Sequence, residues 1–404
     1  MKLRRLFGKY ASEKGNLQNS HVLVSLSLVS LVAILTIAIT SSIPYDLTPP
    51  LNDYFQPLKS VQASSATATG QNNTNTSAVD IGAQNYASRS YSNPVFGIKL
   101  EYPITWSAFE LNSRFRDNVT FGVALLRAPL DNVSDKYAER INFNTQVFDS
   151  KNATLDAYTS SILDSYANTS GVKVLESSAT TLAGQPAHKV VITDDRVEPL
   201  KLKKMQVWSV FNNSKSYVVT FGAEESKYQD YLPLFQNILN SIQVTSSTDN
   251  PQEKTELPFD DPISGIKLQY PSSWAKAQLG QPPRANVDFI AAFFHQENRN
   301  DSISRIGVAS QQLASQNVNL QQYTTNQLKA IERANATGIE DENTEIGGNP
   351  AHSAVFNLNG TKVMQIWTLK DDKAYIFAYQ ANASDFSKEL PNFEKIANSL
   401  KFEE

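Results

Sequence analysis

Through much of the chain, apolar residues alternate with polar ones at every second position, which is the pattern of β-strands with one buried face. FGIKLEY at 96–102 shows this pattern, and Pro103, which has no backbone N–H to donate, ends the run. Turn residues such as Gly184 separate later runs and predict antiparallel hairpins. In the first half of the chain we predict strands over 96–102, from Trp106 onward, and over 119–126, 141–148, 172–182, 186–193, 205–211 and 217–223.

Two segments in each half have apolar residues at the spacing of a helix. The first predicted helix follows a candidate N-cap, Thr154, and its counterpart follows Asn319, with Gln322 placed to complete a capping box. A second helix closes each half. Its apolar face consists of Leu232, Phe235, Ile238 and Ile242 in one half, and of Phe386, Leu390, Phe393, Ile396 and Leu400 in the other.

The chain contains an internal repeat. NPVFGIKLEYPITW (93–106) returns as DPISGIKLQYPSSW (261–274), 168 positions later. Three further motifs return in the same order at offsets of 164, 159 and 158 residues: GQPAH as GNPAH, MQVW as MQIW, and FQNILNSI as FEKIANSL. Because the order is kept while the offset shrinks in small steps, the pattern indicates two copies of one domain that differ in loop length.

From these elements we predict an α+β fold with two tandem α/β/α sandwich domains, each a mostly antiparallel sheet with helices packed on it. The first domain spans residues 91–245 and the second 258–404, joined by a polar linker at 246–257. Each domain is long enough for its own hydrophobic core. A short polar linker does not fix how the two domains are oriented.

The repeated motifs also carry a family resemblance. A domain that opens with GIKLxYPxxW and continues with a G-x-P-A hairpin, a QVW strand, a YVVTF strand and a closing helix resembles the PsbP-like family. That family is named after an extrinsic subunit of the photosystem II oxygen-evolving complex. The resemblance covers both copies and implies an antiparallel sheet with helices on its faces, and a binding or assembly role. Calcium as a cofactor is implied by the resemblance alone.

A long apolar run lies near the N-terminus. Residues 22–39 contain no charge, proline or glycine, and residues 1–20 before them carry a net charge of +4. Since about 20 helical residues cross a bilayer core, we predict one transmembrane anchor at 21–43. The basic tail would be cytoplasmic and the rest of the chain extracytoplasmic at the cell membrane. A cleaved signal peptide is the alternative. Residues 44–90, rich in Ser, Thr and Asn, predict a disordered stalk.

Composition excludes several classes of function. The chain has 404 residues, a net charge of −4 and no Cys. The negative charge does not favour nucleic acid, and the lack of Cys excludes disulfides, thiolate metal sites and a Cys nucleophile. The sequence motifs of hydrolases, zinc proteases, P-loops, dinucleotide-binding folds and EF-hands are absent from the sequence. We therefore expect no catalytic or cofactor-binding residues. Eleven N-x-S/T sites make a glycoprotein feasible outside the cell.

His188 and His352 occupy matching positions of the two copies and are the weak candidates for a metal site. A metal site needs several converging ligands, and no second histidine lies near either of them in the sequence. Asp194 and Asp195 follow in the first copy, but the second copy has no matching acidic pair. We therefore expect structural or exposed histidines.

Other candidate residues have a simpler structural interpretation. Trp106 matches Trp274 and Trp208 matches Trp367, which suits an aromatic platform or core packing, and we favour packing. An S-x-x-K pattern occurs in one copy only, as chance allows. Acidic clusters could bind calcium weakly but are expected, like a group of lysines, to be solvated. The residues concerned are Ser273 and Lys276, Asp260–Asp261, Glu340–Asp341–Glu342, Asp371–Asp372, and Lys201, Lys203 and Lys204.

The function that we predict from the sequence is non-catalytic. A membrane-tethered, extracytoplasmic pair of domains would bind a protein partner and stabilise a membrane or cell-surface complex, because two modules on one chain raise the effective concentration for a repetitive partner. The alternative is a receptor for a small solute, a glycan or a divalent metal such as calcium. Such a receptor needs a concave pocket lined by aromatic rings or carboxylates.

Overall fold

The computed structural model describes residues 87–403, apart from 115–119, 131–134, 136, 149–151, 197–198, 246–254, 281–286, 296–303 and 314–317. Within these residues the protein consists mostly of β-strands with four helices, and one order of elements occurs twice.

The first half holds the elements β1 to β10. Its first predicted helix is confirmed with its cap, because Oγ1 of Thr154 accepts the backbone N–H of Ala157 over 3.2 Å. The first strand begins at Ser88, inside the segment predicted as a stalk. The elements are β1 (Ser88–Asn93), β2 (Ile98–Pro103), β3 (Ser107–Arg114), β4 (Thr120–Arg127), β5 (Arg140–Val147), α2 (Leu155–Ala167), β6 (Val172–Leu182), β7 (Gln185–Asp194), β8 (Leu202–Phe211), β9 (Lys215–Glu224), α3 (Tyr228–Ser241) and β10 (Gln243–Val244).

The second half repeats this order. The predicted capping box is confirmed, since Asn319 and Gln322 each bond the other's backbone N–H, over 2.9 and 3.3 Å. The first strand begins at Glu256, within the predicted linker. The elements are β11 (Glu256–Asp261), β12 (Ile266–Pro271), β13 (Trp274–Gln278), β14 (Val287–His295), β15 (Arg305–Gln312), α4 (Leu320–Arg333), β16 (Thr337–Ile346), β17 (Asn349–Leu358), β18 (Thr361–Lys370), β19 (Lys373–Asn382), α5 (Phe386–Asn398) and β20 (Lys401–Phe402).

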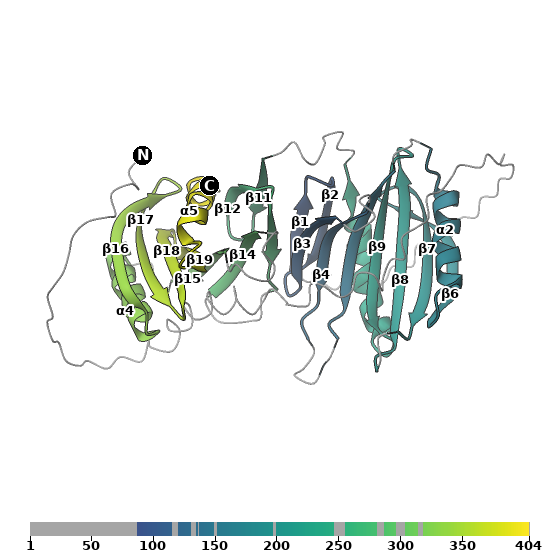
Figure 1. Ribbon diagram of the computed structural model, residues 1–404, viewed down its shortest axis with the longest axis horizontal. Helices are drawn as coiled ribbons and strands as arrows, with labels where there is room; N and C mark the ends of the chain where they lie inside the picture. Colours follow the sequence, from purple (N-terminus) through teal and green to yellow (C-terminus); the bar gives the residue numbers. More distant parts are fainter. Residues whose placement is uncertain are drawn as a thin grey trace.

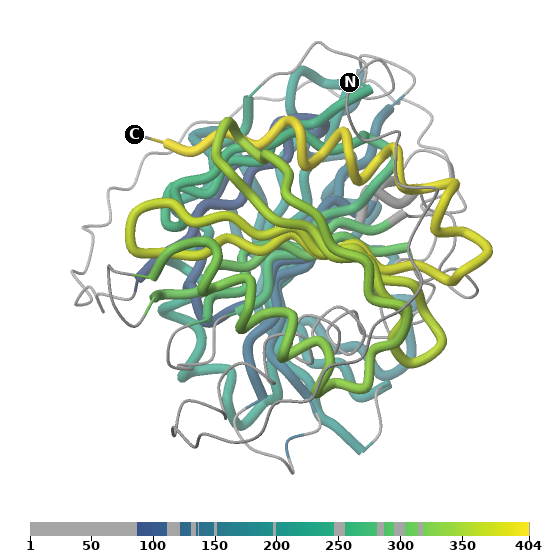
Figure 2. The backbone as a smooth tube through the Cα atoms, turned by 90° about the vertical axis from the view of Figure 1, so that its left-hand side faces the viewer, coloured from purple at the N-terminus to yellow at the C-terminus, as the bar shows by residue number. Residues whose placement is uncertain are grey.

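Fourteen strands form one continuous antiparallel sheet, in the order β16-β17-β18-β19-β15-β14-β13-β3-β4-β5-β9-β8-β7-β6. Figure 1 shows the first half on the right and the second on the left, so that β6 and β16 are the outer edges of this sheet. Seen along the long axis in Figure 2, the strands of the two halves are turned relative to each other, as the twist of a large sheet requires. Each half adds a small sheet, β1-β2-β10 or β11-β12-β20.

Hydrophobic clusters lie on both faces of the large sheet. In the first half, α2 packs on β6, β7 and β8 around Trp208, whereas α3 packs on β2 and β9. In the second half, the cluster that includes residues of α4 surrounds Trp367. The interpretation of the four tryptophans as core residues is confirmed, because Trp106 is 3% exposed and the other three are fully buried.

The two halves meet where β3 pairs with β13. Phe109 lies opposite Ala277, and Ala108 lies opposite Gln278. The repeat offset of 168 residues makes Phe109 and Ala277 equivalent positions. Equivalent strands therefore meet as they would in a two-fold symmetric dimer, with the local axis between these two residues.

Two equivalent tyrosines reach across this junction. The hydroxyl of Tyr102 donates to Oε1 of Gln278 over 3.3 Å, and the hydroxyl of Tyr270 donates to Oε2 of Glu110 over 2.8 Å. Gln278 and Glu110 are also equivalent positions, and all four residues are buried. The tyrosine hydrogen bond is thus repeated on both sides of the local axis, but its acceptor is the carboxylate of Glu110 on one side and the neutral amide of Gln278 on the other.

A buried lysine lies beside Glu110. Lys276 is 3% exposed and replaces the equivalent Ala108. Its Nζ donates to the carbonyl of Ser92 over 3.3 Å, and its backbone N–H donates to Oε2 of Glu110 over 3.2 Å. Burial lowers the pKa of Lys276, against the opposing charges of Glu110 and Asp261. The charged form of Lys276 is therefore favoured by the carboxylates of Glu110 and Asp261.

Arg89 and Asp261 make a second charged contact between the halves. Nε of Arg89 lies 3.6 Å from Oδ1 of Asp261, and both side chains are 1% exposed. Arg89 also donates through Nη1 to the carbonyl of Leu279 over 3.5 Å. Since a buried charge is costly unless it is paired, these contacts favour one relative position of the two halves.

The predicted fold class is wrong. Two separate α/β/α sandwiches were expected, but the described residues form a mostly β structure in which one sheet runs through both halves. In an isolated half, β3 or β13 would be an exposed edge with unpaired backbone groups, and pairing the two edges removes it. The four helices cover only parts of the large sheet.

The prediction of a single-pass membrane protein also requires correction. No helix in the described part of the chain is long and apolar enough to cross a membrane. The run predicted as an anchor, 21–43, lies outside the described residues, as do the tail and most of the stalk. The transmembrane assignment and the predicted localisation, with a cytoplasmic N-terminus and extracytoplasmic domains, are therefore not supported and are not carried further.

The junction yields a prediction about stability. We expect Glu110→Gln and Lys276→Met each to lower the free energy of unfolding by about 3 kcal/mol, because each removes one of the opposite charges that are buried together at the junction. The double variant should lose clearly less than the sum of the two single losses. Urea denaturation of the four proteins measures the coupling.

The pair Lys388 and Asp385, 3.0 Å apart, provides the control, since Lys388 is exposed and Asp385 is only partly buried. Lys388→Met and Asp385→Asn should each change the free energy of unfolding by less than about 1 kcal/mol. If Glu110→Gln and Lys276→Met proved additive within about 0.5 kcal/mol, the two charges would not interact and our description of the junction would be incorrect.

Candidate functional site

Each half has an open depression at the same place, where a hairpin turn meets the end of the closing helix. In the first half the turn joins β6 to β7 beside the end of α3, and in the second it joins β16 to β17 beside the end of α5. Equivalent residues line both: Gly184 and Gly348 in the turns, and Asn240 and Asn398 in the helices. The depression has thus been duplicated together with the fold.

The depression in the second half has a volume of about 680 Å³. Gly347 has a φ of +56°, and a Cβ at this position would lie 2.9 Å from Cε2 of Phe402. A side chain at this position would press on the ring of Phe402, whereas the equivalent turn of the first half holds Ala183, with a φ of +49°, where the last strand has the smaller Val244. Charged side chains of both signs line the depression: Glu345, Lys370, Lys401 and Glu403.

The depression in the first half has a volume of about 410 Å³ and no charged side chain among its described lining. Gln243 stands where the second half has Lys401, and Thr181 stands where it has Glu345. The remaining lining residues are Ala183, Gly184, Leu239, Asn240, Ile242 and Val244. The two depressions share their place in the fold but differ in charge, so they would accept different chemical groups.

The two candidate histidines lie on matching strands beside buried tryptophans. The ring of His188, on β7, is 5.3 Å from that of Trp208, and the ring of His352, on β17, is 5.4 Å from that of Trp367, between centroids. The structure places them in opposite halves of the long sheet and does not bring them together.

The polar partners of the two histidines differ. Nε2 of His188 lies 2.8 Å from Oγ of Ser177, and burial lowers the pKa of His188. Nε2 of His352 lies 2.8 Å from Oδ2 of Asp341, and its Nδ1 lies 2.9 Å from Oδ1 of Asn343. Among the described residues, no group of three or more His, Cys, Asp and Glu side chains could hold a metal ion. A calcium cofactor stays a prediction of the family resemblance.

Several other candidates that are close in the sequence are separated in the structure. Asp260 is exposed and pairs with Lys267 over 3.2 Å, whereas its neighbour Asp261 is buried at the junction. Ser273 is exposed while Lys276 is buried, so the S-x-x-K pattern does not form a site. Of the other acidic groups, residues 340–342 lie on the edge strand β16 and residues 371–372 in the turn between β18 and β19.

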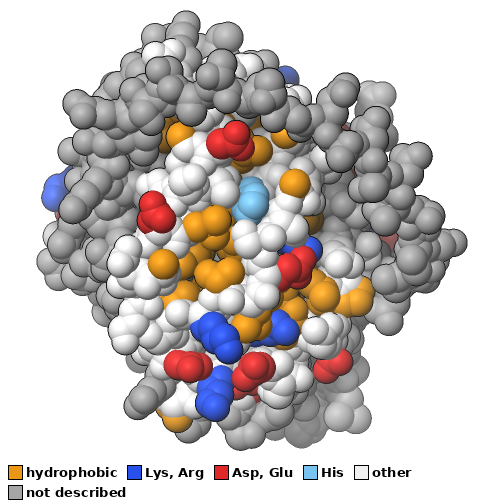
Figure 3. All heavy atoms as spheres, turned by 90° about the vertical axis from the view of Figure 1, so that its right-hand side faces the viewer, with side chains coloured by type: hydrophobic (Ala, Val, Ile, Leu, Met, Phe, Trp, Pro, Cys, Tyr) orange, Lys and Arg blue, Asp and Glu red, His pale blue; other side chains and the backbone are white. Residues whose placement is uncertain are grey.

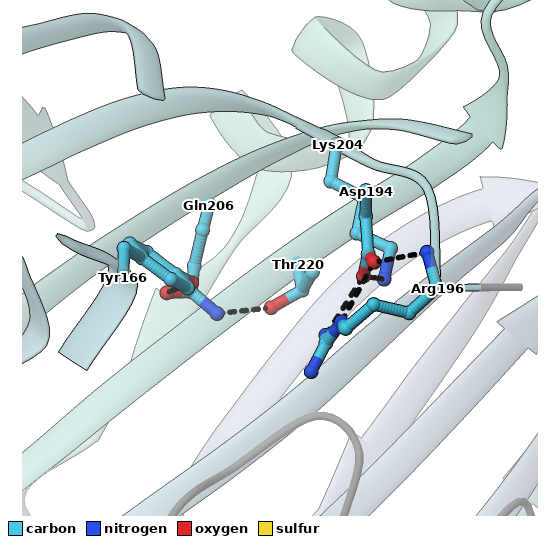
Figure 4. A network of polar contacts seen from close by, with 6 residues as sticks. All are labelled: Tyr166, Asp194, Arg196, Lys204, Gln206 and Thr220. Atoms are coloured by element: carbon cyan, nitrogen blue, oxygen red, sulfur yellow. Dashed lines mark hydrogen bonds and ion pairs between the residues drawn. The ribbon is translucent and has the colours of Figure 1, made fainter. Parts of the chain in front are cut away.

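The structure contains a charged cluster around the buried side chains of Asp194 and Lys204 that was not predicted from the sequence (Figure 4). Asp194, at the end of β7, accepts hydrogen bonds from Nε and Nη2 of Arg196 over 2.8 and 2.9 Å and from Nζ of Lys204 over 2.6 Å. The expectation that Lys204 is exposed is wrong, since it is 4% exposed. A signal was available, because the equivalent positions are apolar in the second half, Leu358 and Val363.

Opposing effects set the pKa values in this cluster. Burial by itself would raise the pKa of Asp194, but the hydrogen bonds from Arg196 and the charge of Lys204 outweigh it and hold the pKa well below its usual range. Burial lowers the pKa of Lys204 to about 8, although Asp194 acts in the other direction. The cluster is therefore charged near neutral pH and ties β7, β8 and the following loop together.

A second set of contacts beside the cluster holds α2 on the sheet. The hydroxyl of Tyr166 donates to Oε1 of Gln206 over 2.7 Å, and Nε2 of Gln206 donates to Oγ1 of Thr220 over 2.9 Å (Figure 4). One helix and two strands are thus joined by a chain of three polar side chains. These contacts and the charged cluster fix the outer end of the first half.

No family model and no curated protein matches the chain. Among solved structures, the chain is similar to cyanobacterial PsbP (CyanoP) from Synechocystis sp. PCC 6803, with 14% identity over 37% of this chain and 92% of that one, at a TM-score of 0.29. It is also similar to LpqN, involved in cell envelope biogenesis of Mycobacterium tuberculosis, with 13% identity over 37% of this chain and 83% of that one, at a TM-score of 0.28.

A third similar structure covers more of the chain than these two. The immunity protein TplEi of the T6SS from Pseudomonas aeruginosa is 10% identical over 78% of this chain and 97% of that one, at a TM-score of 0.30. These likenesses concern the fold alone.

The charged cluster generates a prediction about pH. Because the pKa of Asp194 is depressed in the folded protein, its contribution to stability is fully present above the unfolded value of about 4 and is lost progressively as the pH falls from there toward the lower folded value. We expect Asp194→Asn to lower the free energy of unfolding by about 3 kcal/mol at pH 7 and by clearly less at pH 3. Urea denaturation at a series of pH values measures this difference.

The exposed neighbour Asp195 offers a matched control. Asp195→Asn should leave the free energy of unfolding within about 0.5 kcal/mol of the wild type at either pH. An Asp194→Asn loss of equal size at pH 7 and pH 3 would show that the carboxylate charge does not stabilise this end of the fold.

Proposed function

We propose that the protein is a non-catalytic binding module for a protein partner, which it contacts through the two depressions. The observation that carries the proposal is the recurrence of the depression at the same place in both halves. The continuous sheet holds the two sites at a fixed separation, and a pre-organised pair of contact points reduces the entropy lost on binding. Such a pair suits a partner that presents two contact points.

The chemistry of the depressions favours a protein partner over a small solute. Small-molecule sites are usually clefts that bury most of the ligand among apolar and aromatic side chains. Both depressions here are open, and turn backbone and polar side chains form much of their lining. Lys401 and Glu345, both exposed, give the second-half depression charges of both signs. Side chains of a partner protein can complement such a surface.

A non-catalytic role is part of the same proposal. Ser177 and His188 make the contact of a nucleophile with its base, 2.8 Å apart. In the described part of the chain, however, no carboxylate is hydrogen-bonded to His188 to orient it. The second half has Asp341 at the position of Ser177, so the pair does not recur with the fold. We interpret the serine as a strand residue that satisfies the histidine.

The proposal is tested by capture of a partner with the full chain. The tagged protein is cross-linked in a lysate of the cells that produce it, and the captured proteins are identified by mass spectrometry. We expect Lys401→Glu, which reverses a charge in the second-half depression, to reduce recovery of the specific partner about tenfold. The wild type should recover that partner in a fixed ratio.

Lys329→Glu is the matched control, since it makes the same charge change at an exposed position of α4 outside both depressions. It should leave recovery unchanged. Equal loss in both variants would indicate a general charge effect, and no loss in either would remove the second-half depression from the interface. If native mass spectrometry found a bound small solute and no protein were captured, the receptor would replace our proposal.

A further inference from the structure

The outer edge of the first half is a strand without a neighbour in the described part of the chain. Within the described residues, β6 ends the fourteen-stranded sheet and has β7 as its one strand partner. Val174 and Leu175, 38% and 47% exposed, are two of the five large hydrophobic side chains exposed among the described residues. Figure 3 shows this end of the molecule, with hydrophobic side chains among uncharged surface and charged groups mostly toward one side.

The two edges of the large sheet differ in charge. β16 carries four acidic residues in its sequence TGIEDENTEI, which is how natural edge strands avoid pairing with other strands. β6 has no charged residue from Ser177 to Leu182, where the sequence is SSATTL. Its register against β7 is regular over this stretch, after an irregularity between Val174 and Glu176. The β6 edge therefore has unprotected backbone groups available for another strand.

We infer that β6 pairs with β6 of a second copy of this chain, antiparallel and around a two-fold axis at Ala179. In this register Ser178 lies opposite Thr180 of the second copy, and the charged Glu176 lies opposite Leu182, so no like charges meet. The junction between the halves is an example within this chain of equivalent strands that pair antiparallel around a local axis. A two-fold pairing closes on itself, unlike a head-to-tail one.

The same arrangement is unfavourable at the other edge. If β16 paired with its own copy around Asn343, the position equivalent to Ala179, Asp341 would lie opposite Glu345 on both sides of the axis. Like charges directly opposite each other destabilise a strand pair. The charge pattern thus selects β6 as the edge that dimerises.

The regular part of the inferred pairing ends at Glu176 and Leu182, and the irregularity at Leu175 comes next. Leu175 therefore lies toward the β6–β7 turn of the second copy, where Ala183 lines the uncharged depression of the first half. In the dimer the first-half depressions lie beside the contact between the two copies, and the protein partner would contact the charged second-half depression of each copy. In this respect the inference rests on the proposed function and replaces its first-half contact with a contact between copies.

Sedimentation of the full chain tests the dimer, in a non-ionic detergent because residues 22–39 are apolar. Thr180 and Thr344 are equivalent, half-buried and opposite an alanine of the next strand, so they provide matched variants. We expect Thr180→Lys to weaken the dimer about tenfold or more and Thr344→Lys to leave it within about twofold of the wild type. Circular dichroism should show that both variants are folded.

A cross-link gives a second readout, because the chain has no Cys. Paired residues of antiparallel strands lie at roughly 4.5–5.5 Å between Cα atoms, within reach of a disulfide. Ala179→Cys should form a covalent dimer on mild oxidation, whereas Asn343→Cys at the other edge should remain a monomer. A monomeric wild type, assemblies larger than a dimer, or equal cross-linking of the two variants would overturn the inference.

These results are separable from those on the proposed function. Lys401→Glu, which is expected to lose the partner, should remain a dimer in sedimentation. Thr180→Lys should become a monomer and still capture the partner through its second-half depression. Loss of capture in Lys401→Glu with a monomeric wild type would keep the proposed function and remove the dimer.

Discussion

The antiparallel pairing of β3 with β13 is the contact on which the rest of the structure depends. It converts two sheets into one, leaves β6 and β16 as the outer edges, and sets the separation of the two depressions. The buried charges Glu110, Lys276, Arg89 and Asp261 surround it. Because removing one partner of a buried pair costs about 3–5 kcal/mol, a shifted register that separated these groups would be strongly disfavoured.

The sequence predicted what depends on local pattern. The helix caps at Thr154 and Asn319 and the burial of the repeated tryptophans are confirmed, since capping and strand alternation act over a few residues. The pairing of β3 with β13 could not be predicted, because periodicity identifies a strand without identifying its neighbour, and a polar linker does not fix an orientation. The fold class was wrong for this reason. The burial of Lys276 and Lys204 was not predicted, because the sequence pattern of a strand does not distinguish a lysine that is buried near a carboxylate from one that is exposed.

The two copies differ in where they carry charged residues at equivalent positions. Ala108 and Val363 are the apolar equivalents of Lys276 and Lys204, so at these two positions a charge that replaces an apolar residue in one copy is buried near a carboxylate. The two depressions also differ in charge at equivalent surface positions, since Gln243 in one copy corresponds to Lys401 in the other. The fold has thus been kept in both halves, while the charged positions differ between them. This combination favours a binding protein whose two sites contact different groups.

The central claim is that both halves form one rigid sheet through the junction, and hydrogen exchange of the backbone amides tests it most directly. If β3 and β13 are paired as described, the amides of residues 108–109 and 277–278 that are bonded across the junction should exchange as slowly as those of the central strands β5 and β15, through global unfolding. Exchange at these amides as fast as at the outer strands β6 and β16, under native conditions, would show that the halves separate readily and would contradict the account.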